Sequence, residues 1–214
     1  MGRNSLWQVI KKYRVFVDSN SIYFRQALFF LILNQGHHFF YGGLQYELIK
    51  NGFSKERINE LDNIMVIPIM GFTCLASWFN SMQNIWRNIW IILLLKLITD
   101  VAIFVSMPTQ LWSVALALFL CRLLTACGVL LNTTVVASFP VTALSGVLVS
   151  GFQSAREFGN NSALHQRVIH EVGWSAASIF GFVMHGTIIC VFWSIVEWLN
   201  EGTLDDDDDI KPTD

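Results

Sequence analysis

Charged residues are scarce in this chain. Only 14% of its 214 residues are Asp, Glu, Lys or Arg, whereas 53% are hydrophobic, and the mean hydropathy is +0.48. An ordinary soluble domain carries about a quarter charged residues. The composition therefore excludes an ordinary soluble domain and predicts an integral membrane protein.

Catalytic and metal-binding patterns are also lacking. The stretch HEVGW departs from the zinc pattern HExxH, because Trp174 stands where the second histidine would be. No nucleophile, base and orienting group can be assembled by spacing, so we expect no enzyme activity, no metal site and no cofactor. The cysteines lie in apolar stretches without CxxC spacing and are predicted to be buried thiols: Cys74, Cys121, Cys127 and Cys190.

Long apolar runs, in contrast, are abundant. A helix needs roughly 20 largely apolar residues to cross the hydrocarbon core, and six windows approach this length. The connections between them are short, SMPTQ for example, so consecutive helices should run antiparallel with both termini on one side. We therefore predict an all-α membrane protein with six transmembrane helices over residues 23–199. The windows are approximately Tyr23–Gly43, Asp62–Phe79, Ile85–Met107, Leu111–Ser138, Val141–Phe158 and Gly173–Leu199.

Two segments flank this six-helix domain. Residues 1–22 place apolar side chains at helical spacing beside Lys11, Lys12 and Arg14, which predicts a basic amphipathic helix in the membrane interface. Such a segment also resembles a mitochondrial targeting sequence. Residues 200–214 form an acidic tail containing DDDDD. Seven Lys and Arg residues on the side of the termini, against five opposite, favour termini in the cytoplasm or the mitochondrial matrix.

A polar stretch, Gly43–Pro68, separates the first two windows. Within it Gly52 is a helix-stop residue, and Ser54 is placed to cap a new helix that has Arg57 at its third position. We interpret the stretch as a solvated reversal made of a helix end, a tight turn and a helix start. A role in contacting a ligand is the alternative.

Ionisable residues inside the predicted spans carry the main functional signal. Such groups are costly in hydrocarbon and usually face a bundle interior or a water-filled cavity. Lys96 and Asp100 lie four residues apart on one helix face, and we predict a structural ion pair between them. Arg122 has no local partner, so we expect Asp100, or a group on another helix such as Glu157, to neutralise it. Arg122 fits a structural anchor and a ligand contact equally well.

Polar side chains at similar depth define a candidate binding site. The first window contains LILNQGHHFFYGG, which is typical of a helix that lines a cavity, with hydrogen bonding between closely packed helices as the alternative. The fifth window leads into QSAREFGNNS, where an arginine could hold a phosphate or carboxylate, or pair with a neighbouring carboxylate. The candidate substrate-binding residues are Asn34, Gln35, His38, Arg122, Asn132, Gln153, Arg156 and Glu157.

Two segments resemble a known transporter superfamily. LIKNGFSKERI, followed by an apolar span with Pro68, resembles the connection between the seventh and eighth helices of major facilitator transporters, and FPVTALSGVLVSGFQSAREFGNN resembles their eleventh helix. Residues 23–199 thus resemble the C-terminal six-helix half of that superfamily, most of all the acetyl-coenzyme A transporter family. Folate and biopterin transporters are similar. The stretch NSMQNIWRN supplies only Arg87 where many members have a turn rich in glycine and arginine.

The resemblance implies half of a carrier for an organic anion such as acetyl-coenzyme A. Because alternating access needs two halves around a midplane site, we expect a second half in the bilayer, from another copy or from a separate chain. The alternative is a non-transporting accessory subunit of a larger membrane complex, for example a mitochondrial respiratory complex. For either function we expect a multi-pass protein of the endoplasmic reticulum or the mitochondrial inner membrane, with no nucleic-acid partner.

Overall fold

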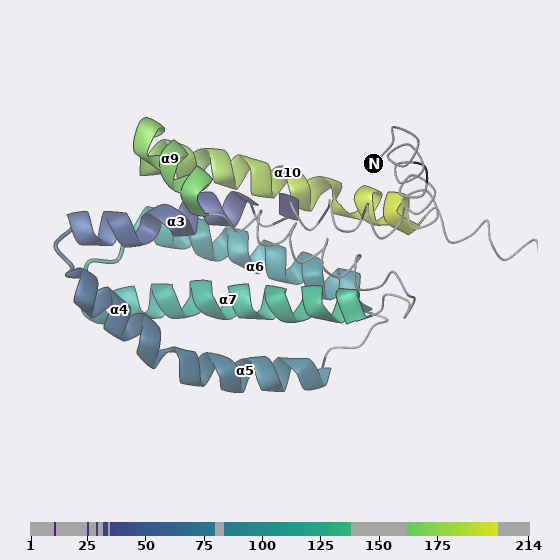
Figure 1. Ribbon diagram of the computed structural model, residues 1–214, viewed down its shortest axis with the longest axis horizontal. Helices are drawn as coiled ribbons and strands as arrows, with labels where there is room; N and C mark the ends of the chain where they lie inside the picture. The colour runs from purple at the N-terminus through teal and green to yellow at the C-terminus, as the bar shows by residue number, and fades with distance from the viewer. Residues whose placement is uncertain are drawn as a thin grey trace, which may run out of the picture.

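The described part of the chain is all-helical, which confirms the predicted class. The computed structural model describes residues 35–79, 84–137 and 162–200, together with Lys11, Arg25, Phe29, Ile32 and Leu33. Figure 1 shows the described helices, most of which lie roughly along one direction while α4 runs obliquely to them. They are α3 (Gln35–Lys50), α4 (Lys55–Ile64), α5 (Val66–Phe79), α6 (Ile85–Ser106), α7 (Leu111–Ala137), α9 (Ser162–Val172) and α10 (Trp174–Asn200).

Three helices of the described residues are long and apolar enough to cross a bilayer, rather than the six predicted for the whole chain. They are Ile85–Ser106, Leu111–Leu131 and Trp174–Leu199, and they match the third, fourth and sixth windows. The fifth window lies outside the described residues, as do the tail from residue 201 and the amphipathic segment apart from Lys11. The chain therefore has the character of a multi-pass membrane protein.

The second predicted span is divided by a helix break. The window Asp62–Phe79 begins inside α4, and α5 is 14 residues long. A turn at Met65 separates the two helices. Pro68 explains the break, because it has no N–H to donate to the carbonyl of Ile64 and its ring clashes with that carbonyl in a continuous helix. The axis of α4 is therefore inclined to that of α5 (Figure 1).

The first predicted window ends too early. Helix α3 continues beyond Gly43 to Lys50. The continuation is stabilised by Phe40, Leu44 and Leu48, which recur every four residues, form one helix face and are fully buried. The apolar stripe therefore extends into a stretch whose exposed face is polar. The predicted window ends at Gly43 because the residues that follow are largely polar.

The reversal between α3 and α4 follows the prediction. Gly52 adopts φ +97°, a left-handed conformation that favours glycine. Ser54 is the N-cap of α4, and its hydroxyl oxygen accepts a 3.2 Å hydrogen bond from the backbone N–H of Arg57. The turn directs α4 across the end of α7, which brings Asp62 of α4 to Arg122 of α7.

Removing this cap should loosen α4 locally. We expect Ser54→Ala to cost about 1 kcal/mol, because the first-turn N–H of Arg57 loses its acceptor. Amide hydrogen exchange of the first turn of α4 should then be about fivefold faster in detergent. Ser54→Asp keeps an acceptor oxygen and should exchange like the unmodified chain. Equal exchange in all three proteins would show that the cap contributes nothing.

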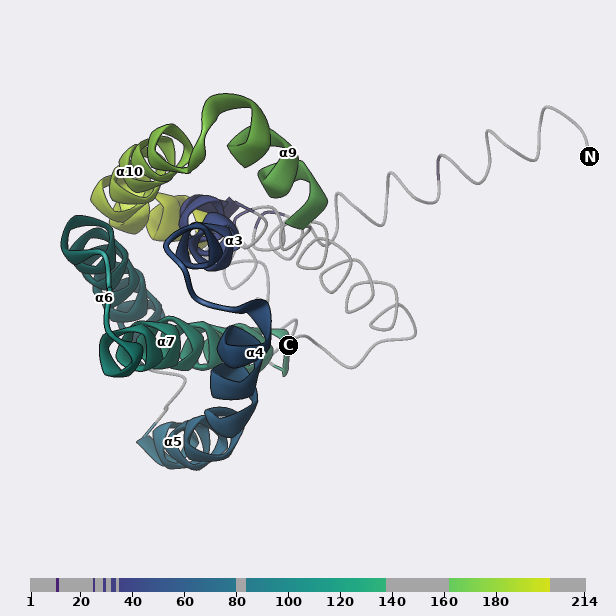
Figure 2. The ribbon, with the colours of Figure 1, turned by 90° about the vertical axis from the view of Figure 1, so that its left-hand side faces the viewer.

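The helices surround α3. Figure 2, viewed along the bundle, shows α10 and α6 on one side of α3, α7 and α4 on another, and α5 outermost beside α7. Helix α3 packs most extensively on α10, with α9 lying against both. Near the far end of α10, the Arg25 guanidinium donates to the carbonyl oxygen of Trp198 at 3.1 Å and lies 4.8 Å from its ring centroid. These contacts place α3 in the centre of the described bundle.

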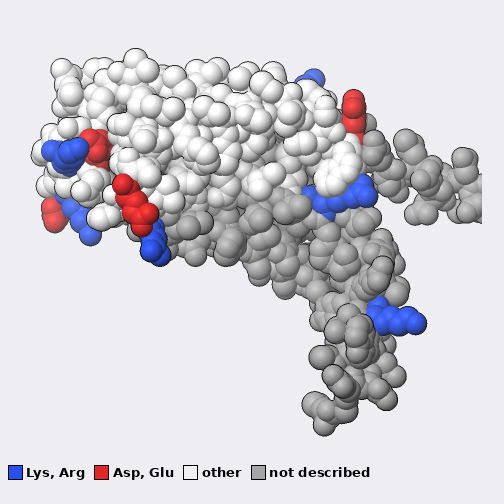
Figure 3. All heavy atoms as spheres, turned by 90° about the horizontal axis from the view of Figure 1, so that it is seen from above, with Lys and Arg blue, Asp and Glu red and all other residues white. Residues whose placement is uncertain are grey.

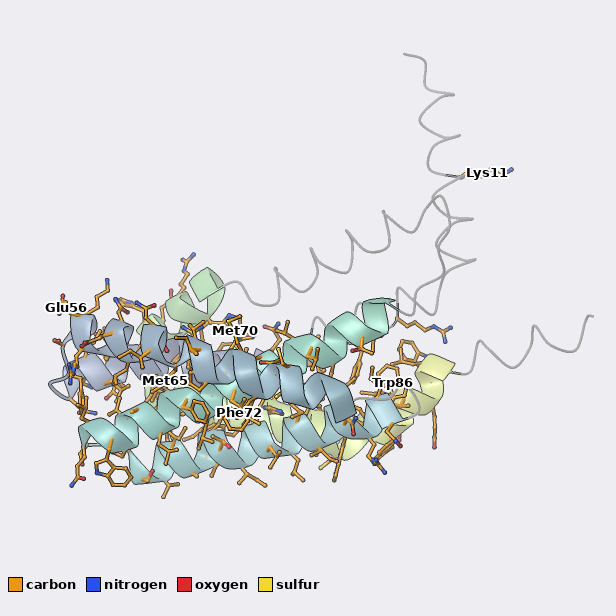
Figure 4. All side chains as sticks on the ribbon, turned by 90° about the horizontal axis from the view of Figure 1, so that it is seen from below. Lys11, Glu56, Met65, Met70, Phe72 and Trp86 are labelled. Carbon is orange, nitrogen blue, oxygen red and sulfur yellow. The ribbon has the colours of Figure 1, made fainter. Side chains whose placement is uncertain are left out.

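The outward faces are apolar. In Figure 3 the middle of the molecule, viewed from above, presents a broad surface without charge, and charged residues gather towards its two ends. In Figure 4, viewed from below, α5 lies over α7 and carries Met70 and Phe72, with Glu56 and Trp86 near opposite ends of the bundle. Such a belt matches hydrocarbon contact. Its large exposed side chains include Ile67, Met70, Ile91, Leu95, Ile98, Val105, Leu116, Ile179, Phe180, Val183, Val191 and Trp193.

The interior is divided into two hydrophobic clusters. One is built around Phe29, Leu93 and Phe192, and the other around Phe40, Leu118 and Trp174. Along α3, α6 and α10, four buried polar residues lie between the residues of the two clusters. They are His37, Lys96, Asp100 and His185. The core is therefore interrupted by a polar layer, defined here as those four residues together with Cys121 and Thr125 of α7.

Candidate functional site

The polar layer lies at the middle of the three spans. Lys96, Cys121 and His185 are each within two residues of the midpoint of their span, in α6, α7 and α10 respectively. Lys96 and His185 have at most 2% of their surface exposed. A charge at this depth costs about 3 kcal/mol in translocon-based scales, so each buried charged group of the layer requires a partner inside the protein.

The centre of the layer is a contact between His37 and Asp100. His37 Nδ1 of α3 lies 2.8 Å from Asp100 Oδ2 of α6, and both side chains are 1% exposed. The carboxylate interacts electrostatically with Lys96 on its own helix and with His185 of α10. One acidic group thus meets three basic side chains from three helices in a space without solvent.

Helix α7 supplies the other two members of the layer. Cys121 directs its thiol to Asp100 Oδ1 at 3.9 Å. Thr125, one turn later, lies with Oγ1 3.2 Å from His37 Nε2 and donates its hydroxyl proton to the backbone carbonyl of Cys121 at 2.8 Å. Both ring nitrogens of His37 are therefore bonded, and His37 links α3 to α6 and α7.

Glycines let the helices approach at this level. A Cβ on Gly36 would lie 2.7 Å from Cβ of His185 and would overlap the carbonyl oxygen of Gly181, while a Cβ on Gly128 would lie 3.4 Å from Lys96 Nζ. Close backbone contact between α3 and α10 explains how His185 reaches the interior. The Nε2 atom of His185 is buried and has no hydrogen-bond partner within the described residues.

Arg122 is neutralised by a group on another helix, as one of the two predictions has it, and that group is Asp62 of α4 rather than Asp100. The example given for such a group, Glu157, lies outside the described residues. Its Nε donates to Asp62 Oδ1 at 3.2 Å and its Nη2 to Oδ2 at 2.5 Å, a bidentate arrangement. Gln45 Nε2 donates to the same carboxylate at 3.2 Å, and the guanidinium lies 5.8 Å from the ring centroid of Tyr41. The sequence does not single out Asp62, because it is 60 residues away and belongs to the stretch interpreted as a solvated reversal.

A cleft of about 670 Å³ opens beside this ion pair. Arg122 is 47% exposed whereas Asp62 is 11% exposed, so the guanidinium is the more accessible partner. The cleft is polar on the side of α4 and apolar on that of α5. Its lining residues are Asn59, Asp62, Asn63, Val66, Ile69, Met70, Arg122, Thr125 and Ala126. Because Thr125 also contacts His37, it connects the cleft to the polar layer.

Comparisons with protein families, with curated proteins and with solved structures find no match for this chain.

Of the remaining candidate residues, the structure describes the side chains of Gln35 and His38. Gln35 accepts a 2.9 Å hydrogen bond at Oε1 from Nε2 of His165 in α9, and the His38 ring lies 5.7 Å from the same imidazole. This pair is therefore part of the α3–α9 contact. Asn132 lies in α7, but its side chain is outside the described set, and the four others fall outside the described residues: Asn34, Gln153, Arg156 and Glu157.

Lys96 and Asp100, the predicted ion pair, belong to a larger cluster of polar side chains. Both side chains are buried on α6 and interact electrostatically. The oxygen atoms of Asp100, however, contact His37 and Cys121. Among the cysteines, Cys121 is buried as predicted, whereas Cys74 and Cys190 are exposed, because they lie on outward faces of α5 and α10.

The prediction of the site missed four important residues: His37, Asp62, Thr125 and His185. His37 belongs to the polar stretch of the first window, but the predicted site contains its neighbour His38 instead. A usable signal existed, since the buried stripe Phe40, Leu44 and Leu48 places His37, and not His38, on the interior face of α3. No sequence spacing connects Asp62 or His185 to the site, because both come from other helices.

Proposed function

We propose that this chain is half of a major-facilitator-type carrier for an organic anion such as acetyl-coenzyme A, with six membrane-crossing segments in the whole domain. The observation that carries the proposal is the cleft beside Arg122, which brings an accessible guanidinium to the middle of a span. Arginines at this depth generally mark substrate pathways or partnered structural sites.

The chemistry of the cleft suits an anionic ligand. A guanidinium binds a carboxylate or phosphate through two parallel hydrogen bonds, and Asp62 occupies that geometry here. An incoming phosphate would take the place of Asp62 on Arg122. Asn59 and Asn63 line the same wall and supply amide donors. Asp62 then acts as the internal counter-ion of the empty carrier.

The accessory-subunit alternative expects the polar groups to bond to one another and the cavity to be closed. The contact of Gln35 with His165 fits that expectation. The half-exposed Arg122 and the open cleft beside it do not. Transport is therefore the function that the described geometry supports best.

Uptake by reconstituted vesicles tests the proposal. The full chain is placed in proteoliposomes, alone and with candidate partner halves, and the entry of labelled acetyl-coenzyme A is measured. We expect Arg122→Ala to lower uptake about tenfold to a hundredfold, because a charge-assisted contact is lost, and Arg122→Lys to fall between, because it keeps the charge without the bidentate geometry.

Arg167→Ala is the matched control, since Arg167 pairs with Glu171 on the exposed surface of α9 and lies away from the cleft. Its uptake should equal that of the unmodified chain. Absence of uptake in every pairing would refute transport and leave the accessory-subunit function.

A further inference from the structure

The contact between His37 and Asp100 in the polar layer requires a proton between the two side chains. Thr125 donates its own proton to the Cys121 carbonyl at 2.8 Å, so its oxygen accepts one from His37 Nε2. The other ring nitrogen, Nδ1, then lies 2.8 Å from a carboxylate oxygen of Asp100. A lone pair facing a carboxylate at this distance would be repulsive. In this arrangement one proton must lie between His37 and Asp100.

In this arrangement the pair holds two protons, one on Nε2 of His37 and one between His37 and Asp100. The same atoms accommodate the loss of one of them, called here the extra proton. If His37 keeps a single proton on Nδ1, this nitrogen donates to Asp100, and Nε2 becomes an acceptor. The Thr125 hydroxyl then rotates from the Cys121 carbonyl to Nε2. His37, Asp100 and Thr125 each remain hydrogen bonded in both states, so the pair can bind or release one proton without leaving any of these three side chains unsatisfied.

The neighbouring charges set the electrostatic context. The pair faces Lys96 on α6, the Cys121 thiol on α7 and His185 on α10. Arg122 lies three residues before Thr125 in α7, and its positive charge is compensated by Asp62 of α4. With Lys96 charged and Asp100 ionised, the layer without the extra proton is neutral. Addition of the proton creates a net positive charge beside the cleft, where it favours an anion.

Thr125 provides the route to water. It lines the cleft and contacts His37 with the same side chain. During release, the Nε2–H bond of His37 breaks as a new O–H bond forms at Thr125, and the former hydroxyl proton of Thr125 passes to a water molecule in the cleft. The water leaves as hydronium, and no oxidant or further reactant is needed. Among the described residues, no three acidic, histidine or cysteine side chains are placed to share a metal ion.

We propose that the His37–Asp100 pair is a proton-binding site, loaded and emptied from the Arg122 cleft through the hydroxyl of Thr125. The coupling of this proton to anion movement rests on the proposed function, but the proton site itself does not. If transport occurs, the protonated layer and the anion occupy adjoining spaces and stabilise each other. The proton is then the co-substrate of the carrier.

Nitrogen NMR of the full chain, labelled with ¹⁵N-histidine in lipid nanodiscs, tests the site without a transported substrate. His37→Gln identifies the His37 signals by their loss. We expect the ring signals of His37 to change reversibly between about pH 5 and about pH 9, the range that brackets the ordinary titration of histidine. Identical His37 signals at both extremes would overturn the proposal.

The route is tested by variants of Thr125. Thr125→Val, which keeps the shape but lacks the hydroxyl, should slow proton exchange at His37 Nε2 by about tenfold or more, and Thr125→Ser should restore it. Thr187→Val is the control, because Thr187 makes the same kind of bond to the Val183 carbonyl on an exposed face of α10. Exchange in Thr125→Val as fast as in the control would refute the route. A chain that titrates at His37 yet takes up no acetyl-coenzyme A would refute transport alone.

Discussion

Asp100→Asn should destabilise the protein by about 3–5 kcal/mol, which is the usual cost of removing one partner from a buried charge pair. The substitution preserves the shape of the side chain but removes the negative charge that compensates Lys96 and interacts with His185. It also replaces the carboxylate that contacts His37 at 2.8 Å. Reversible unfolding in mixed micelles with increasing SDS measures the loss.

Asp62→Asn is the matched control for this substitution. Its partner Arg122 is 47% exposed, so solvent compensates the guanidinium, and we expect a cost of about 1 kcal/mol or less. The double variant Lys96→Met and Asp100→Asn should recover part of the stability, because no buried charge then lacks compensation. An Asp100→Asn protein as stable as Asp62→Asn would contradict the electrostatic role of the polar layer.

Gly36→Ala should be the most disruptive of the small substitutions. A Cβ on Gly36 would overlap the backbone carbonyl oxygen of Gly181, and a Cβ on Gly181 would lie 2.5 Å from the carbonyl oxygen of Gly36. Backbone cannot move aside as a flexible side chain does, so α3 and α10 must separate. We expect a cost of about 3 kcal/mol, at the upper end of the usual overpacking range, measured by the same SDS titration.

Gly71→Ala on α5 separates crowding from helix propensity. A Cβ there meets no other atom within 4 Å, and alanine favours a helix over glycine by about 0.5–1 kcal/mol. The control should therefore be neutral or slightly stabilising. If Gly36→Ala matched Gly71→Ala in stability, the close approach of α3 and α10 would be wrong.

The sequence predicts those parts of the fold that depend on local pattern. The bounds of α6, α7 and α10 follow from unbroken apolar runs, and Gly52 and Ser54 mark the turn before α4 because their effects on the backbone are local. The break at Met65 was also readable, since Pro68 removes a hydrogen bond from any continuous helix there. The prediction of one span over Asp62–Phe79 rests on its apolar residues alone and does not include the effect of the proline.

The site depends on contacts between distant helices, which one sequence does not contain. Arg122 was found from its depth in an apolar run, but its partner Asp62 was interpreted as solvated because the letters around it are polar. His37 pairs with Asp100 across 63 residues. The packing of α3 on α10 decides which histidine is interior, and that packing depends on Gly36 and Gly181.

Water access beside Arg122 is the claim on which the anion site and the proton route both depend, and cysteine labelling measures it directly. Ala126→Cys is introduced on the cleft wall, with Cys74, Cys127 and Cys190 replaced by serine. Leu95→Cys, on an outward face near the midpoint of α6, is the control at the same depth. We expect a membrane-impermeant methanethiosulfonate to label Ala126→Cys, acetyl-coenzyme A to slow that labelling, and Leu95→Cys to stay unlabelled in lipid. Labelling of Ala126→Cys no faster than that of Leu95→Cys would contradict an aqueous cleft beside Arg122.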